Sequence, residues 1–193
     1  MNSKYKIIDK IKLHDGFFKL YDLSFTHIQH NGKWSPKISR EIFSGAHVAT
    51  VLPYDPIKNK ILLLKQFRAG VLKKGHDPLV TEIVAGIIDD GETPQEAAKR
   101  ECLEETGCKV NSLKEIYPYY PAPGSSESYY HLFLAEIDAF EGEKILGQKY
   151  ENEDILVKSY DISEVRELMK EHKIINGLSL IALQWFFLEY YKN

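Results

Sequence analysis

Three glutamates crowd the end of one predicted helix, and their type and spacing could hold a divalent cation. The segment 86–108 reads GIIDDGETPQEAAKRECLEETGC, and Glu101, Glu104 and Glu105 fall in the last turns of its helix. Residues three and four apart lie on the same side of a helix, so these carboxylates are neighbours. Like charges at this spacing cost about 0.2–0.5 kcal/mol per pair, and the negative end of the helix dipole opposes them further. Because locally unfavourable sequence often marks a functional site, a bound cation is the simplest compensation.

The alternative is a solvated acidic face on which the repulsions are small and screened. The residues before the helix favour a metal site, because Asp89, Asp90 and Glu92 add carboxylates in a turn that also contains Gly86 and Gly91. All these candidate ligands are oxygens, which favours Mg²⁺, with Mn²⁺ as a substitute, over zinc. Magnesium held by a few carboxylates typically acts on phosphate oxygens, so a diphosphate compound is the expected substrate.

The helix that positions these carboxylates has marked ends. Thr93 is a good N-cap, Pro94 occupies the first helical position, Glu96 completes a capping box and Gly107 provides the stop. The sequence therefore predicts a helix over residues 94–106.

Alternating or short apolar runs predict the strands around this helix. They lie at 5–13 and 17–25, at 47–67 as a hairpin with its turn at 55–60, and at 79–86, 127–137 and 154–162. Two further helices are predicted, one near 163–171 and an apolar one capped by Asn176. Strands interleaved with helices predict an α/β (α+β) fold, an α/β/α sandwich with a mixed sheet. Residues 1–45 form a small β-rich segment before a main domain of residues 46–193.

Length and composition limit the possible functions. The 193 residues suffice for one domain with a small appended lobe. A net charge of -3 argues against a nucleic-acid binder. With no signal-like N-terminus and no apolar stretch approaching the length of a membrane span, we expect a cytoplasmic protein without a membrane partner. Cys102 and Cys108 would point about 240° apart on a helix, so neither a disulfide nor a thiol metal site is expected.

The glutamate segment resembles a known signature. Gly86, Glu92 and the run 100–108 (RECLEETGC) are similar to the Nudix box, which marks enzymes that hydrolyse a nucleoside diphosphate linked to another group. The charged and glycine positions match, whereas Cys102 and Cys108 stand where the family usually has Leu, Ile or Val. Further stretches resemble the ADP-ribose pyrophosphatase branch over roughly residues 15–190: IFSGAHVATVLPYDP, LLLKQFR, EIVAGIIDDGE, YPAPGSSES, ENEDILV and IALQW.

The resemblance implies roles at the diphosphate. Glu101, Glu105, the Ala85 carbonyl and Glu153 would be metal ligands. Glu104 would assist catalysis beside Glu105, and Glu151 would be the general base, although another acid serves in some relatives. Four residues would hold the motif together, with Arg100 paired to Glu92: Gly86, Glu92, Arg100 and Gly107.

The resemblance also implies substrate contacts at Arg68, Glu82 and Pro123. Phe17 and Arg40 match residues that reach across a homodimer to the partner's nucleotide. Relatives commonly carry an acid five residues after the proline, where this chain has Ser128 preceded by Glu127, so the role of Glu127 stays open.

The expected function is Mg²⁺-dependent cleavage of the pyrophosphate of ADP-ribose, and of related ADP-sugars, to AMP and the sugar phosphate, which is ribose 5-phosphate for ADP-ribose. GDP-mannose or another nucleoside-diphosphate sugar is the alternative substrate, because that branch shares a similar proline loop and N-terminal strands. A non-catalytic nucleotide-binding module is a second alternative. Such a module would be expected to lack the glutamates of the box.

Overall fold

The computed structural model describes residues 3–72, 77–148 and 152–191. The chain divides into two compact units. The N-terminal unit comprises residues 1–46 together with 120–129, and the main unit comprises residues 47–119 together with 130–193.

The N-terminal unit is a three-stranded antiparallel sheet in the order β1-β2-β3, made of β1 (Tyr5–Asp15), β2 (Lys19–His27) and β3 (Ile38–Phe43). The loop 120–129 joins it through the backbone, because Phe43 N donates to Ser125 O at 2.8 Å and Glu127 N donates to Phe43 O at 3.0 Å. Lys10 adds an ion pair of 3.1 Å to Glu127. A loop distant in sequence therefore belongs to this unit.

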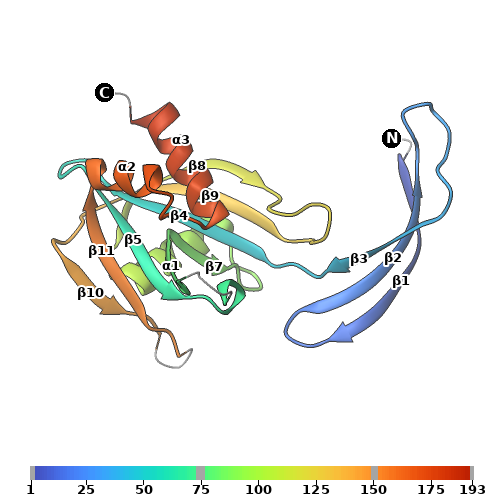
Figure 1. Cartoon of the computed structure of the whole chain (residues 1–193), viewed down its shortest axis with the longest axis horizontal. Coiled ribbons are helices and arrows are strands. Elements are labelled where there is room, and N and C mark those ends of the chain that lie inside the picture. The colour runs from blue at the N-terminus through green and yellow to red at the C-terminus, as the bar shows by residue number, and fades with distance from the viewer. Residues whose placement is uncertain (1–2, 73–76, 149–151, 192–193) are drawn as a thin grey trace. The chain divides into compact units, whose positions relative to one another are not determined.

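The main unit is built on an eight-stranded sheet, whose central path runs β10-β11-β5-β4-β9-β8 (Figure 1). Two short strands lie off this path, with β6 pairing β5 and β7 pairing β4. The strands are β4 (His47–Asp55), β5 (Lys60–Phe67), β6 (Leu79–Glu82), β7 (Val84–Ile87), β8 (Val110–Tyr119), β9 (Tyr129–Ile137), β10 (Glu143–Leu146) and β11 (Ile155–Asp161).

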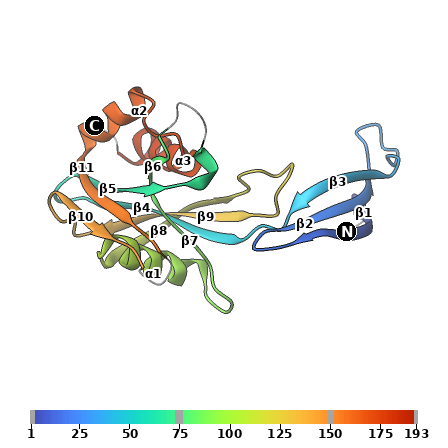
Figure 2. The same cartoon turned by 60° about the horizontal axis from the view of Figure 1, so that its bottom comes forward.

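Helices cover both faces of this sheet, as Figure 2 shows. Helix α1 (Pro94–Thr106) packs on one face, where Cys102 and Phe133 belong to a common buried cluster. The other face carries α2 (Ile162–Lys170), α3 (Gly177–Trp185) and a π-helical turn (Phe186–Tyr190), with Leu183 and Phe186 fully buried. The predicted α/β/α sandwich with a mixed sheet is confirmed. Both cysteines are free, and no helix of the described residues is long and apolar enough to cross a membrane.

The predicted single strand over residues 79–86 is wrong, because the structure breaks it at Ile83 into β6 and β7. Ile83 N donates to the side chain of Ser179 at 3.0 Å instead of to a neighbouring strand. The break lets β6 pair with β5 and β7 pair with β4. It also places Glu82 at the end of β6 and Ala85 within β7, on the two strands that border the candidate site.

The predicted hairpin between β4 and β5 is held by a buried carboxylate. Asp55 is 2% exposed and accepts backbone N–H groups from Ile57, Lys58 and Ala139, each at 2.9 Å. Burial opposes its charge, but these three donors outweigh burial and hold the pKa of Asp55 below its ordinary value.

Candidate active site

Helix α1 begins and ends where its sequence predicts. The side chain of Thr93 accepts from Glu96 N at 3.2 Å, and Thr93 N donates back to the Glu96 carboxylate at 2.8 Å. Gly107 closes the helix with a φ of 70°, a left-handed conformation that favours glycine. Because both ends of the helix are fixed, the position of each glutamate along the sheet is fixed as well.

Arg100 organises the acidic turn before the helix and the acidic helix itself. Its Nε and Nη2 donate to the two oxygens of Glu92, each at 2.9 Å, and Nη2 also donates to the carbonyl of Ile87 at 3.0 Å. Its Nη1 lies 2.6 Å from Glu101 and 3.2 Å from Glu104. The hydrogen bond from Arg100 lowers the pKa of Glu92, and Glu92 and Glu101 in turn raise the pKa of Arg100. One guanidinium therefore compensates three carboxylates.

Gly86 gives the Glu101 carboxyl its space. A Cβ on Gly86 would lie 1.9 Å from Cδ of Glu101, well inside any permitted contact. Burial raises the pKa of Glu101, although the Arg100 guanidinium acts in the opposite direction. Only a glycine lets this carboxylate pack directly against β7.

Glu105 is the most buried of the three helix glutamates, at 4% exposure. Its carboxylate accepts from Ala85 N at 3.3 Å, which places the backbone of β7 against it. Burial, with the negative charges of Glu101 and Glu153, raises the pKa of Glu105 to about 9, while Ala85 N–H and Arg68 lower it in part. The group therefore holds a proton at neutral pH unless a cation replaces that proton.

Glu153 belongs to the same electrostatic cluster, since its charge raises the pKa of both Glu101 and Glu105. Gln148 N donates to its carboxylate at 3.1 Å. The loop is tight at this point, because a Cβ on Gly147 would meet Cβ of Glu153 at 2.8 Å. Glu151, the predicted general base, lies outside the described residues.

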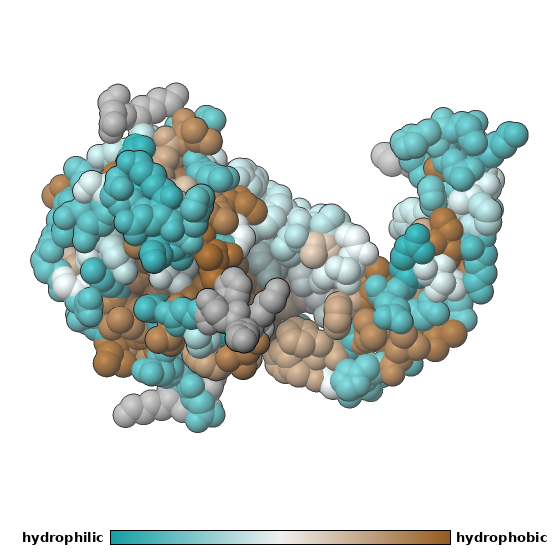
Figure 3. All heavy atoms as spheres, viewed as in Figure 1, coloured by the Kyte–Doolittle hydropathy of each residue, from teal (hydrophilic) through white to brown (hydrophobic). Residues whose placement is uncertain are grey.

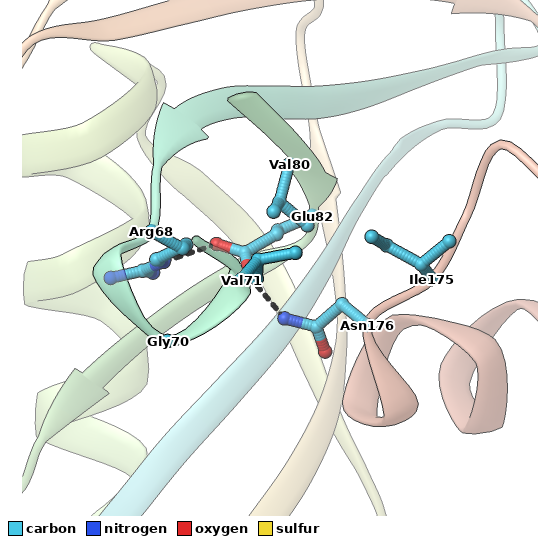
Figure 4. Close-up of a pocket in the computed structure, with 7 residues that line it drawn as sticks. All are labelled: Arg68, Gly70, Val71, Val80, Glu82, Ile175 and Asn176. Atoms are coloured by element: carbon cyan, nitrogen blue, oxygen red, sulfur yellow. Dashed lines mark hydrogen bonds and ion pairs between the residues drawn. The ribbon is translucent and has the colours of Figure 1, made fainter. Parts of the chain in front are cut away.

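A cavity of about 420 Å³ opens beside the end of β5 (Figure 4). Glu82 lies at its inner side, and Arg68 Nε donates to the Glu82 carboxylate at 2.7 Å. The remaining lining residues are Gly70, Val71, Val80, Ile175 and Asn176. The positive charge of Arg68 also lowers the pKa of Glu105 in part, so the two groups interact electrostatically.

Three predicted substrate contacts lie in the N-terminal unit. Phe17 is 86% exposed, and its ring meets that of Phe18 edge to face at 4.9 Å. Arg40 is exposed on β3 and donates to its neighbour Ser39 O at 2.7 Å. Pro123 is exposed in the loop 120–129. The glutamates of α1 and Glu153 belong to the main unit.

Comparison with known proteins identifies the family. The model of the NUDIX domain matches residues 45–178, which is more than half of the chain. The chain belongs to the Nudix family.

Nudix relatives that resemble the chain extend over most of its length. The ADP-ribose pyrophosphatase of Escherichia coli (strain K12) is 36% identical over 180 residues, which cover 93% of this chain and 86% of that protein. The enzyme of the same name from Haemophilus influenzae is 33% identical over 188 residues, covering 96% of this chain and 87% of that protein. A GDP-mannose pyrophosphatase of Salmonella paratyphi B is 31% identical over 180 residues, which cover 93% of this chain and 92% of that protein.

A solved structure described as an ADP compounds hydrolase has the same Nudix fold. It superposes with a TM-score of 0.71 over 96% of this chain and 95% of that chain. Its sequence identity is only 17%, so the likeness concerns the fold alone.

Nudix hydrolases generally use divalent metal ions, and the carboxyl oxygens at the end of α1 are the type of ligand that Mg²⁺ prefers. Glu101, Glu105 and Glu153 are electrostatically coupled carboxyl groups, and a cation would offset their negative charge when all three are ionised. In the described part of the chain, no three His, Cys, Asp or Glu side chains surround a common point. Arg100 takes one oxygen of Glu101, so an ion at this place would compete with Arg100.

The sequence pattern did not reveal that Asn176 lies in the cavity with Arg68 and Glu82. The sequence predicted Asn176 only as a helix cap. In the structure the Asn176 side chain donates a hydrogen bond to Glu82, 94 positions earlier in the chain. No local motif carries such a signal, because the contact forms only when α3 packs on the sheet.

Proposed function

We propose that the chain is a Mg²⁺-dependent hydrolase that cleaves ADP-ribose into AMP and ribose 5-phosphate. The observation that carries the proposal is the buried Glu105 beside Glu101 and Glu153, in a Nudix chain that is 36% identical to an ADP-ribose pyrophosphatase over 180 residues. Such a carboxyl set is costly in an empty site and useful beside a diphosphate.

The proposed reaction adds water across the diphosphate. The water oxygen bonds to one phosphorus, the bridging P–O bond breaks, and one water proton passes to a carboxylate base. A bound Mg²⁺ would neutralise phosphate charge and lower the pKa of that water. We assign the base to Glu151 and the metal ligands to Glu101, Glu105, Glu153 and the Ala85 carbonyl, with Glu104 assisting.

The chain's own residues prepare the rest of the site. The guanidinium of Arg68, which is fixed by Glu82 at 2.7 Å, offers its remaining donors to a phosphate oxygen. Arg100 and Glu92 brace the loop before α1, so the carboxylates keep their positions during turnover. We assign substrate contact to Arg68 and Glu82 in the main unit, and to Pro123 in the N-terminal unit.

A substrate panel tests this function. The protein is incubated with Mg²⁺ and separately with ADP-ribose, ADP-glucose, GDP-mannose, NADH and diadenosine polyphosphates, and the products are separated by chromatography. We expect the highest kcat/KM for ADP-ribose, with AMP and ribose 5-phosphate formed in equal amounts and no turnover in EDTA. Turnover that persists in EDTA would overturn the metal assignment.

GDP-mannose is the second candidate substrate, because the GDP-mannose pyrophosphatase is 31% identical over 93% of this chain. A higher kcat/KM for GDP-mannose would replace the substrate but keep the metal site. Binding of a nucleotide without hydrolysis of any compound would favour a binding module.

We also propose that two copies pair through the N-terminal unit, with Phe17 and Arg40 of one copy reaching the nucleotide of the other. Apolar side chains are exposed on this unit (Figure 3), among them Phe17, Ile7 at 59% and Ile11 at 53%. Light scattering should give the mass of a dimer. Phe17→Ala should raise KM while leaving the mass unchanged, and a monomeric wild type would contradict the pairing.

A further inference from the structure

Glu82 links the N-terminus of α3 to the arginine of the cavity. Its side chain is 5% exposed, and both oxygens have partners: Oε2 accepts from Arg68 Nε at 2.7 Å, and Oε1 accepts from Asn176 Nδ2 (Figure 4). A buried carboxylate is stable only with such partners. Arg68 and Asn176 therefore hold the same carboxylate through different oxygens.

Helix α3 fixes the amide of Asn176. Its Oδ1 accepts from Leu178 N at 3.0 Å and Ser179 N at 3.4 Å, which orients the amide NH₂ toward Glu82. The side chain of Ser179 in turn accepts from Ile83 N at 3.0 Å. Helix α3 is thus bonded both to Glu82 and to the residue that follows it, so the Glu82 carboxylate has little freedom to move.

The orientation of Arg68 depends on this carboxylate. The guanidinium is planar, so a fixed Nε also sets the direction of its terminal Nη donors. The Arg68 side chain is 43% exposed, and it lines the cavity together with the apolar side chains of Val71 and Val80. Its Nη donors are therefore available to an anionic ligand that enters the cavity.

We propose that Asn176 is a positioning residue. Through the Glu82 carboxylate, it holds the Arg68 guanidinium in the orientation that receives an anionic oxygen of the substrate. This inference rests on the proposed function, which places a diphosphate at Arg68. Asn176 itself touches Glu82 and not the reacting atoms.

Solvent exchange of the Arg68 Nε–H tests the link without any substrate. The ¹⁵N signal of this group is assigned by its loss in Arg68→Lys, and its exchange is followed in the whole, ligand-free chain. Asn176→Ser keeps a good helix cap but removes the donor to Glu82. We expect exchange roughly tenfold faster in Asn176→Ser, because a charge-assisted hydrogen bond is lost from the network. Equal exchange in both proteins would overturn the proposal.

Ser179→Ala is the matched control. It removes a buried hydrogen bond from the same end of α3 without touching Glu82. We expect a lower melting temperature with unchanged Nε–H exchange. If Ser179→Ala accelerates the exchange as much as Asn176→Ser does, general loosening of α3 explains both and the positioning role fails.

Kinetics with ADP-ribose and Mg²⁺ test the consequence for catalysis. Asn176→Ser should raise KM roughly tenfold while kcat changes less than about twofold. In an Arg68→Ala background the same substitution should add nothing, because its effect passes through Arg68. Additive effects would overturn the proposal. If the wild type does not hydrolyse ADP-ribose, the proposed function fails instead, and the exchange experiment still decides the role of Asn176.

Discussion

Replacing Glu105 by Gln should stabilise the metal-free protein while it removes catalysis. Glu105 is 4% exposed, and burial with the charge of Glu101 raises the pKa of its carboxyl to about 9. In the unfolded chain the pKa returns to about 4.5, the ordinary value. Between these values the unfolded chain is ionised at Glu105 and the folded protein is protonated, so folding takes up one proton.

The sign of the pH effect follows from that proton. Folding that takes up a proton becomes less favourable as the pH rises, by about 1.4 kcal/mol per pH unit for one group. The stabilising contribution of the protonated Glu105 carboxyl is fully present below pH 4.5, and it is lost as the pH rises to about 9. From pH 6 to pH 8 the wild type should therefore lose ~3 kcal/mol from this residue, whereas Glu105→Gln loses nothing there.

Urea unfolding in EDTA at pH 6, 7 and 8 measures the difference. The free energy of unfolding of Glu105→Gln should exceed that of the wild type by an amount that grows by about 1–3 kcal/mol across this range. Glu104→Gln is the matched control, because Glu104 is 29% exposed and paired with Arg100. Its difference from the wild type should stay constant. Parallel curves for the wild type and Glu105→Gln, or a less stable Glu105→Gln, would refute the reasoning.

Magnesium should reverse this order. An ion that binds the ionised carboxylate releases the proton of Glu105, so calorimetry at pH 7 in buffers of different ionisation enthalpy should show about one proton released per site. Mg²⁺ should stabilise the wild type more than Glu105→Gln. The variant should lose turnover by ~100-fold or more. Equal stabilisation of both proteins would contradict the assignment of Glu105 as a ligand.

Three further substitutions test single features. Gly86→Ala should displace the Glu101 carboxylate, since the new Cβ would lie 1.9 Å from its Cδ, and weaken Mg²⁺ activation roughly tenfold; an unchanged Mg²⁺ titration of activity would contradict this. Asp55→Asn should lose about 1–3 kcal/mol at pH 7, and urea unfolding should show the deficit shrinking as the pH falls below the ordinary Asp pKa of 3.8. Thr93→Ala should cost about 1 kcal/mol of unfolding free energy without changing kcat, whereas equal stability would exclude a role for the capping box.

Local signals in the sequence were sufficient for α1 and its surroundings. The capping box at Thr93 and the left-handed Gly107 act within a few residues of themselves, so the predicted and observed bounds of the helix agree. Strands were harder to predict. β8 (VNSLKEIYPY) is an edge strand with much of its length exposed, and its apolar residues do not alternate with polar ones, so the sequence pattern did not predict it. The break at Ile83 depends on Ser179, a partner 96 residues away.

The cavity could be predicted only in part for the same reason. Arg68 and Glu82 drew attention through the family resemblance and the end of an apolar strand, but their pairing with each other and with Asn176 is a property of the packed sheet. The local sequence around a charged residue in a strand does not indicate which distant group will be its hydrogen-bond partner. Helix α3 has the sequence of an ordinary apolar helix, and the residues that line the cavity beside it, Ile175 and Asn176, both precede its first turn.

The sequence presents the three glutamates of α1 as equivalent, and the structure separates them. Glu101 and Glu104 both form ion pairs with Arg100 Nη1, at 2.6 and 3.2 Å, so the guanidinium already compensates their negative charge. Among the described residues, no Lys or Arg forms an ion pair with Glu105, which has only the N–H of Ala85 at 3.3 Å. The ionised form of Glu105 is therefore unfavourable by itself. The carboxyl takes up a proton in the free protein, and a metal ion that binds with the substrate would replace that proton. The energetic cost of the like charges at the helix end therefore falls mainly on Glu105. This residue should account for most of the coupling between pH, metal binding and stability.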